Sequence, residues 1–136
     1  MVIPADEAAH CIGDAVASVQ AQSGCDYELI VVDDGSTDDL ASVLVPYADD
    51  LRVVRQENRG LAAARNRGWG EAQGEFVAFL DADDRWRPGK LAAQVALLTQ
   101  RPGVGFCTTT AILASPEGGA LGRWSCLGAR SEGGRG

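Results

Sequence analysis

The sequence predicts a three-layer α/β fold with a mainly parallel sheet. Short runs rich in β-branched residues alternate with longer segments in which apolar residues recur every three or four positions. The short runs are typical of buried strands, and the longer segments are typical of amphipathic helices. Strands and helices that alternate in this way form βαβ units, in which parallel strands lie between layers of helices.

The first half of the chain shows this alternation of strands and helices. The elements expected there are, in order, a strand at 2–4, a helix ending near 23–24, a strand at 27–32 and a helix at 36–47. The spacing of Ile12, Val16 and Val19 places them on one face of the first helix. The second helix is expected to begin at Ser36, because Ser-Thr-Asp-Asp has the spacing of a capping box.

The second half continues the alternation and then loses it. The expected elements are a strand at 51–54, a helix at 61–73, a strand at 76–80, a helix after Pro88 and a strand at 104–109. Proline suits a first helical turn because its missing N–H would have no partner there. Gly and polar residues dominate from residue 115. We therefore expect one domain at 1–113 and an irregular, disordered tail at 114–136.

Composition excludes several classes of function. The chain has 136 residues, 46% of them hydrophobic, which is enough for the core of one domain. Its net charge of −7 and scattered basic residues argue against a nucleic-acid surface. No apolar stretch approaches the roughly 20 residues of a membrane span, and no signal-peptide pattern precedes the first strand. The cytoplasm is the expected location, with the four cysteines as reduced thiols.

Two acidic motifs carry most of the functional information. Asp33 and Asp34 follow one predicted strand, and Asp81, Asp83 and Asp84 follow another. Ligands of open α/β sheets bind at the carboxyl ends of the strands, so we expect these carboxylates to face one crevice. Clustered carboxylates repel one another unless a cation compensates them, and their hard oxygen atoms suit Mg²⁺ or Mn²⁺. The alternative is that each motif is a polar turn followed by a helix cap.

Four motifs in a fixed order extend this reading over residues 1–113. They are Val-Ile-Pro at 2–4, Val-Val-Asp-Asp-Gly-Ser-Thr-Asp at 31–38, Asn-Arg-Gly-Leu-Ala-Ala-Ala-Arg-Asn at 58–66 and Gly-Glu-Phe-Val-Ala-Phe-Leu-Asp-Ala-Asp-Asp at 74–84. Together they resemble the pattern of glycosyltransferase family 2, whose members have the Rossmann-like GT-A fold. The resemblance implies a hexosyltransferase-like, inverting enzyme that transfers sugar from a nucleotide diphosphate to an acceptor hydroxyl.

The resemblance also implies a role for individual residues. Asp34 is expected to hydrogen-bond the nucleotide base, and Asp83 together with Asp81 is expected to bind the Mg²⁺ or Mn²⁺ that bridges the diphosphate. Arg65 is expected to add a cationic contact, although a solvated helix arginine is an equal reading. The full set expected to bind the nucleotide-sugar donor is Pro4, Ala5, Asp34, Arg65, Asp81 and Ala82.

The chain departs from the family pattern at two points. Ala5, Asp6 and Glu7 stand where the family has a small residue, an aromatic residue and asparagine, so the aromatic group that stacks on the base is missing. The family domain also continues for about another hundred residues, beyond the size of a small domain, and that part supplies the acceptor site and the general base. We therefore expect a sheet incomplete at the C-terminus, no catalytic base in this chain, an unknown acceptor, and an exposed sheet edge that favours a homo-oligomer.

Two other functions stay open at this point. A noncatalytic module that binds a nucleotide and a metal would have kept the donor half alone. A phosphatase of the haloacid dehalogenase type also has an apolar strand followed by Asp-x-Asp, but it needs a suitably placed lysine and a distal acidic pair. Lys90 is the only lysine of this chain, which makes the phosphatase the weakest of the three.

Overall fold

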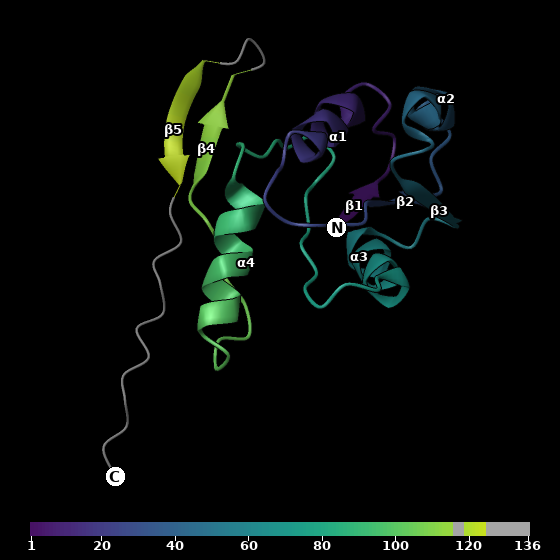
Figure 1. The fold of residues 1–136 in the computed structure, drawn as a ribbon. Coiled ribbons are helices and arrows are strands. Elements are labelled where there is room, and N and C mark those ends of the chain that lie inside the picture. Colours follow the sequence, from purple (N-terminus) through teal and green to yellow (C-terminus); the bar gives the residue numbers. More distant parts are fainter. Residues whose placement is uncertain (116–118, 125–136) are drawn as a thin grey trace. The chain divides into compact units, whose positions relative to one another are not determined.

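The computed structural model describes residues 1–115 and 119–124 (Figure 1). The chain divides into two compact units, with the boundary between Leu97 and Leu98. The first unit contains the parallel sheet, and the second contains an antiparallel pair of strands. The predicted domain boundary at residue 113 stays a prediction.

The first unit is built on three parallel strands in the order β1, β2, β3. The strands are β1 (Val2–Ala5), β2 (Ile30–Asp34) and β3 (Arg52–Gln56). All residues of β1 and β2 are buried, which explains why both runs are continuously apolar up to their ends. β3 is the outer strand of the three and is largely exposed. An oligomer through this edge stays a prediction.

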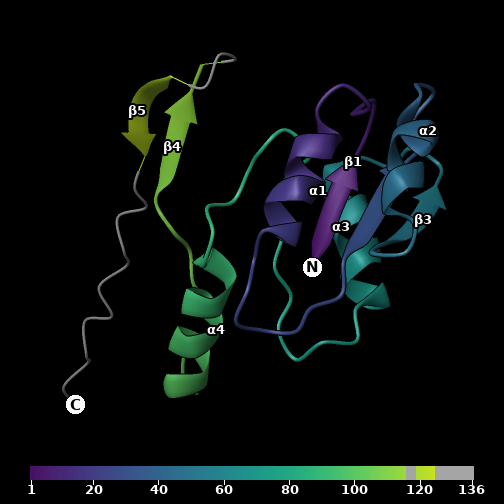
Figure 2. The same cartoon turned by 45° about the horizontal axis from the view of Figure 1, so that its top comes forward.

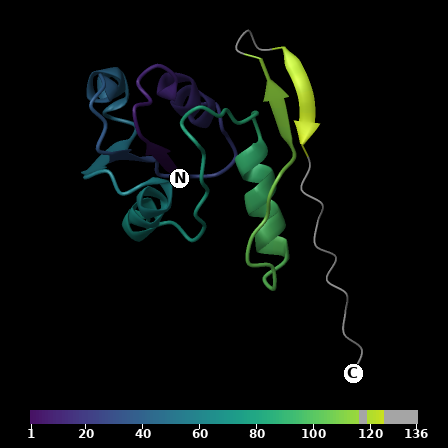
Figure 3. The same cartoon turned by 180° about the vertical axis from the view of Figure 1, so that it is seen from behind.

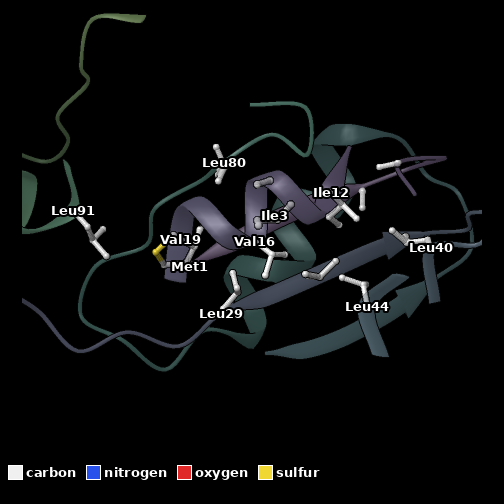
Figure 4. Close-up of a cluster of buried hydrophobic side chains, with 14 residues drawn as sticks. Met1, Ile3, Ile12, Val16, Val19, Leu29, Leu40, Leu44, Leu80 and Leu91 are labelled. Atoms are coloured by element: carbon white, nitrogen blue, oxygen red, sulfur yellow. The ribbon is translucent and has the colours of Figure 1, made fainter. Parts of the chain in front are cut away.

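Helices cover both faces of this sheet. α1 (Ile12–Gln20) and α2 (Leu40–Leu44) lie on one face, and α3 (Leu61–Glu71) lies on the other (Figures 2 and 3). Successive strand residues point to opposite faces, so Ile3 and Val31 pack under α1 and α2 (Figure 4), whereas Val2 and Ile30 pack with Ala64 of α3. The three-layer α/β prediction is confirmed.

The predicted fourth strand at 76–80 is reduced to a single bridge beside β1. Val2 pairs with Phe79 in parallel, through hydrogen bonds from Val2 N to Ala78 O (2.9 Å) and from Leu80 N to Val2 O (3.1 Å). The next bond of this ladder would need an N–H at Pro4, which proline lacks. The segment still runs beside β1, so the acidic residues 81–84 that follow it lie at the carboxyl end of the sheet.

The second predicted helix is shorter than expected and begins later. α2 ends at Leu44, and a 3₁₀ turn, η1 (Val45–Tyr47), follows it. Pro46 cannot donate the next helical hydrogen bond, which explains the change. The capping-box prediction is wrong, because α2 begins at Leu40 and the side chain that accepts a hydrogen bond from its first N–H is Asp38 (3.2 Å), not Ser36. The Ser36 hydroxyl instead accepts a hydrogen bond from Glu7 N (3.1 Å), which ties the loop after β2 to the loop after β1.

The elements after the acidic residues differ in part from the prediction. α4 (Lys90–Gln100) forms as expected, and its Leu91 belongs to the core of the first unit, but residues 104–109 are not a strand. Two strands that were not predicted, β4 (Ala111–Ala114) and β5 (Ala120–Trp124), pair antiparallel, and β5 lies inside the predicted tail at 114–136. Residues 125–136 of that predicted tail lie outside the described residues. Within the described residues, no helix is both long and apolar enough to cross a membrane.

Gly68 sets the distance between α3 and the sheet. A Cβ built on Gly68 would lie 2.2 Å from Cγ1 of Val2, whereas a Cβ on Gly70 would meet nothing within 4 Å. We expect Gly68→Ala to lower the free energy of unfolding by about 1–3 kcal/mol, because overpacking outweighs the better helix propensity of alanine.

Gly70→Ala is the matched control on the same helix, and it should raise stability by up to about 1 kcal/mol. Urea unfolding of the two variants measures both effects. Equal stability of the variants would contradict the close packing at Gly68.

Candidate functional site

The carboxyl ends of β1 and β2 border a cavity of about 100 Å³. Its lining comes from both strand ends and from the first turns of α3, and consists of Pro4, Ala5, Asp6, Asp34, Leu61 and Ala64. Three residues predicted from sequence to bind the nucleotide, Pro4, Ala5 and Asp34, therefore lie together. Leu61 and Ala64 were missed as lining residues, although the motif at 58–66 marked their segment.

Asp34 is a buried carboxylate that organises the loop before α3. Its Oδ1 accepts hydrogen bonds from Gln56 Nε2 (2.7 Å) and Arg59 N (2.9 Å), and its Oδ2 accepts one from Gly60 N (2.7 Å). Burial alone would raise the pKa of Asp34, but these three hydrogen bonds and the charge of Arg59 outweigh it and hold the pKa below its ordinary value. The ionised carboxylate thus fixes the start of α3 against β2.

Only Asp34 of the five carboxylates expected to face one crevice lines the cavity. Asp33, which precedes it, does not. Its side chain accepts a hydrogen bond from Ser36 N (2.8 Å) and forms an ion pair with Arg55 Nη1 (3.1 Å). The reason is the alternation of a strand, which turns neighbouring side chains to opposite faces. The Asp33 side chain therefore holds the turn after β2, which matches the polar-turn part of the alternative stated for this motif.

Two glycines allow the chain to pass close to the cavity. Gly35 has φ of +81°, and a Cβ there would lie 2.7 Å from the backbone N of Asn58. Gly60 has φ 84° and ψ 164°, a conformation essentially limited to glycine. Together they bring the loop before α3 against the turn after β2, so that its amides reach Asp34.

Asp6 and Glu7, the residues that depart from the family pattern, are tied to neighbouring loops. Asp6 Oδ2 accepts a hydrogen bond from Asn58 Nδ2 (3.1 Å). Glu7 Oε1 accepts hydrogen bonds from Thr37 N (2.6 Å) and Thr37 Oγ1 (2.9 Å). Asp6 also lines the cavity, which therefore contains two carboxylates and no aromatic ring.

A second group of predicted residues connects α3 to the acidic turn. Arg65 Nη2 pairs with Asp81 Oδ1 at 2.6 Å, and both side chains are about 40% exposed (38% and 41%). Arg65 Nε is buried and has no hydrogen-bond partner among the described residues. Ala64, the preceding residue, lines the cavity. The ion pair of Arg65 with Asp81 therefore connects the part of α3 beside the cavity with the first residue of the acidic motif.

Residues 81–84 form a turn closed by a hydrogen bond from Asp84 N to Asp81 O (3.0 Å). Asp83 and Asp84 are exposed, whereas Ala82 packs against the core under α1. Partial burial, followed by the charges of Asp83 and Asp81, raises the pKa of Asp84. This acidic turn is thus a site of crowded negative charge, held at the end of the sheet.

The donor atoms of this turn fit a magnesium or manganese ion that is shared with a ligand. In the described part of the chain, no three His, Cys, Asp or Glu side chains are grouped to hold a metal ion. Mg²⁺ usually binds through one or two carboxylates plus substrate phosphates and water, so a full protein cage is not required. Asp81 and Asp83 supply that number of hard oxygen ligands.

Fold and site define a class: an α/β domain with a small cavity and an acidic turn at the carboxyl ends of its parallel strands. The model of the family "Glycosyl transferase family 2" matches residues 1–122. The chain therefore belongs to glycosyltransferase family 2.

Two curated relatives illustrate the match. The succinoglycan biosynthesis protein ExoU of Rhizobium meliloti is 48% identical over 96 residues, which cover 67% of this chain and 28% of that protein. The UDP-Glc:alpha-D-GlcNAc-diphosphoundecaprenol beta-1,3-glucosyltransferase WfgD of Escherichia coli is 34% identical over 100 residues, or 72% of this chain and 40% of WfgD. The chain thus spans less than half the length of these two relatives.

A solved structure supports the GT-A fold. The mannosyltransferase PcManGT of Pyrobaculum calidifontis, determined in complex with GDP-Man and Mn²⁺, superposes with a TM-score of 0.69 at 27% identity. The match covers 85% of this chain and 35% of that enzyme. The predicted GT-A fold and family are therefore confirmed, while the role of each predicted site residue stays a prediction.

Proposed function

We propose that this chain binds a nucleotide-diphosphate sugar together with Mg²⁺ or Mn²⁺ and forms the donor-binding part of an inverting hexosyltransferase. The observation that carries the proposal is the continuity of the site: the cavity at the strand ends leads, through Ala64 and Arg65 of α3, to Asp81 and the acidic turn. A base, a diphosphate and a metal would need these three parts in that order.

Different residues would bind different parts of such a donor. Pro4, Ala5 and Leu61 give the cavity apolar walls for a flat base, and Asp34 offers its remaining lone pairs to an N–H of that base. Arg65 has a buried N–H with no partner in the described part of the chain, and a phosphate oxygen would satisfy it.

Asp81 and Asp83 would hold the metal, whose chemistry when bound is to neutralise charge on the departing nucleotide. The chain's own contribution is to fix the donor so that an acceptor hydroxyl approaches its sugar from one side. The acceptor and the general base are unassigned.

Calorimetric titration tests the proposal directly. Uridine and guanosine diphosphates are titrated into the full chain, once with Mn²⁺ and once with excess EDTA. Both bases belong in the experiment because WfgD is named for UDP-Glc and PcManGT was solved with GDP-Man. We expect binding of at least one diphosphate that depends on Mn²⁺; equal affinities in EDTA for both nucleotides would overturn the proposal.

Asp6→Tyr should tighten nucleotide binding. The substitution places an aromatic ring in the cavity wall and removes one of its two carboxylates, and stacking of a base on an aromatic ring is worth about 1–3 kcal/mol. This corresponds to a roughly 5- to 150-fold lower Kd. Calorimetry with the better-binding diphosphate measures the change.

Asp6→Asn is the control for that variant, because it removes the charge without adding a ring. If Asp6→Tyr binds no better than Asp6→Asn, the base does not stack at this position.

A noncatalytic nucleotide-binding module is the second candidate. Measurement of donor hydrolysis separates the two candidates: Mn²⁺-dependent release of sugar favours the transferase, and binding with no turnover favours the module.

A further inference from the structure

A buried glutamine ties the segment after the acidic turn to the end of α1. Gln22, just past that helix, is only 6% exposed. Its Nε2 donates hydrogen bonds to Ser18 O (3.1 Å) and Arg87 O (3.0 Å), and its Oε1 accepts one from Leu91 N (3.0 Å). One side chain therefore binds α1 and both ends of the segment that leads into α4.

Ser18 of α1 adds a second attachment, closer to the acidic turn. Its Oγ accepts a hydrogen bond from Trp86 N (3.1 Å) and donates one to Ala15 O (2.8 Å). Trp86 follows Asp83 by three residues. Because the Trp86 amide is held by Ser18, the backbone of Asp83 stays within about 10 Å of that amide. An ion pair between Arg85 and Asp14 lies in the same stretch, but both side chains are well exposed, and such pairs add little.

The entrance to the acidic turn is fixed independently. Leu80 N donates to Val2 O (3.1 Å) in the sheet, and Asp81 is paired with Arg65 of α3. The turn at 81–84 is thus held at its start by β1 and α3 and at its exit by Ser18 and Gln22. Its crowded carboxylates would otherwise relax apart, because like charges repel.

We propose that Ser18 and Gln22 are positioning residues for the acidic turn, which they hold ready to receive a divalent cation shared with the donor diphosphate. The inference rests on the proposed function for its ligand. Its physical basis is preorganisation: a turn that is already ordered does not lose that conformational freedom when the ion binds. Neither residue touches the ligand, and both act through the backbone amides and carbonyl of residues 86–91.

The test uses the full chain and four variants. Gln22→Ala and Ser18→Ala remove the attachments, and Ser18→Thr keeps the hydroxyl. Gln20→Ala is the matched control, because Gln20 lies on the same helix and its amide donates only to the exposed Asp50 (2.8 Å). Hydrogen exchange of the Trp86 and Leu91 amides is measured without metal, and diphosphate binding is measured with Mn²⁺ and with EDTA.

We expect faster exchange of the Leu91 amide in Gln22→Ala and of the Trp86 amide in Ser18→Ala. In both, Mn²⁺-dependent affinity should fall roughly 10- to 100-fold, the range found when groups that orient metal ligands are lost. Affinity in EDTA should not change, and Ser18→Thr and Gln20→Ala should resemble the wild type. If Gln22→Ala fails to fold, the milder Ser18→Ala decides.

Two outcomes overturn the proposal and differ in what else they affect. If the amides exchange faster while Mn²⁺-dependent affinity is unchanged, Ser18 and Gln22 only stabilise the fold, and the proposed function stands. If the wild type shows no Mn²⁺ dependence at all, the proposed function fails and this inference falls with it.

Discussion

Asp83→Ala is expected to abolish the dependence of nucleotide-diphosphate binding on Mg²⁺ or Mn²⁺. Asp83 is exposed in the acidic turn and is one of two carboxylates that would hold the ion. Loss of a group that merely orients a ligand costs about 10- to 100-fold in metal affinity, and loss of the ligand itself should cost more. Calorimetry in Mn²⁺ should therefore give the affinity that the wild type shows in EDTA.

A charge-matched control separates the metal from general electrostatics. Asp49→Ala removes one negative charge from the exposed loop between η1 and β3 and should leave the Mn²⁺ dependence intact. Asp83→Ala also removes a like charge from the turn. If that variant keeps the full effect of Mn²⁺, the ion binds elsewhere or the turn is structural.

Asp34→Asn should lower the free energy of unfolding by about 2–3 kcal/mol. The carboxylate accepts hydrogen bonds through both oxygens, and an asparagine amide would turn an NH₂ group toward one of these donors. Hydrogen bonds to charged groups contribute roughly 1.5–3 kcal/mol, and unmet buried donors cost a similar amount. Asp50→Asn is the surface control, because the Asp50 side chain accepts a hydrogen bond from the exposed Gln20 amide, and it should stay within about 0.5 kcal/mol of the wild type.

The effect of Asp34 should also depend on pH. Its pKa is lower in the folded protein than in the unfolded chain, where aspartate titrates at about 3.9. The stabilisation is thus fully present above that value and is lost as the pH falls through the folded pKa. Urea unfolding at neutral pH and at pH values below about 4 should show the gap between wild type and Asp34→Asn closing. A gap that widens in acid would mean that the folded pKa is raised.

Local patterns in the sequence were sufficient for the fold class, the order of most elements in the first unit and the family. Ile12, Val16 and Val19 recur with helical spacing and are buried on one face of α1. The continuous apolar runs of β1 and β2 are buried throughout. In both cases the apolar pattern predicts burial, because a residue's exposure follows from the period of its element. The acidic motifs were recognisable because their residues are adjacent in the chain.

Only the tertiary structure decided which of those residues meet. The loss of the fourth strand beside Pro4 and the pairing of Arg65 with Asp81 depend on neighbours distant in sequence. The attachment of the acidic turn through Ser18 and Gln22 likewise joins segments more than sixty residues apart (68 and 65). Local propensity and period contain no information on such contacts, because side-chain direction and partner are set by packing between elements.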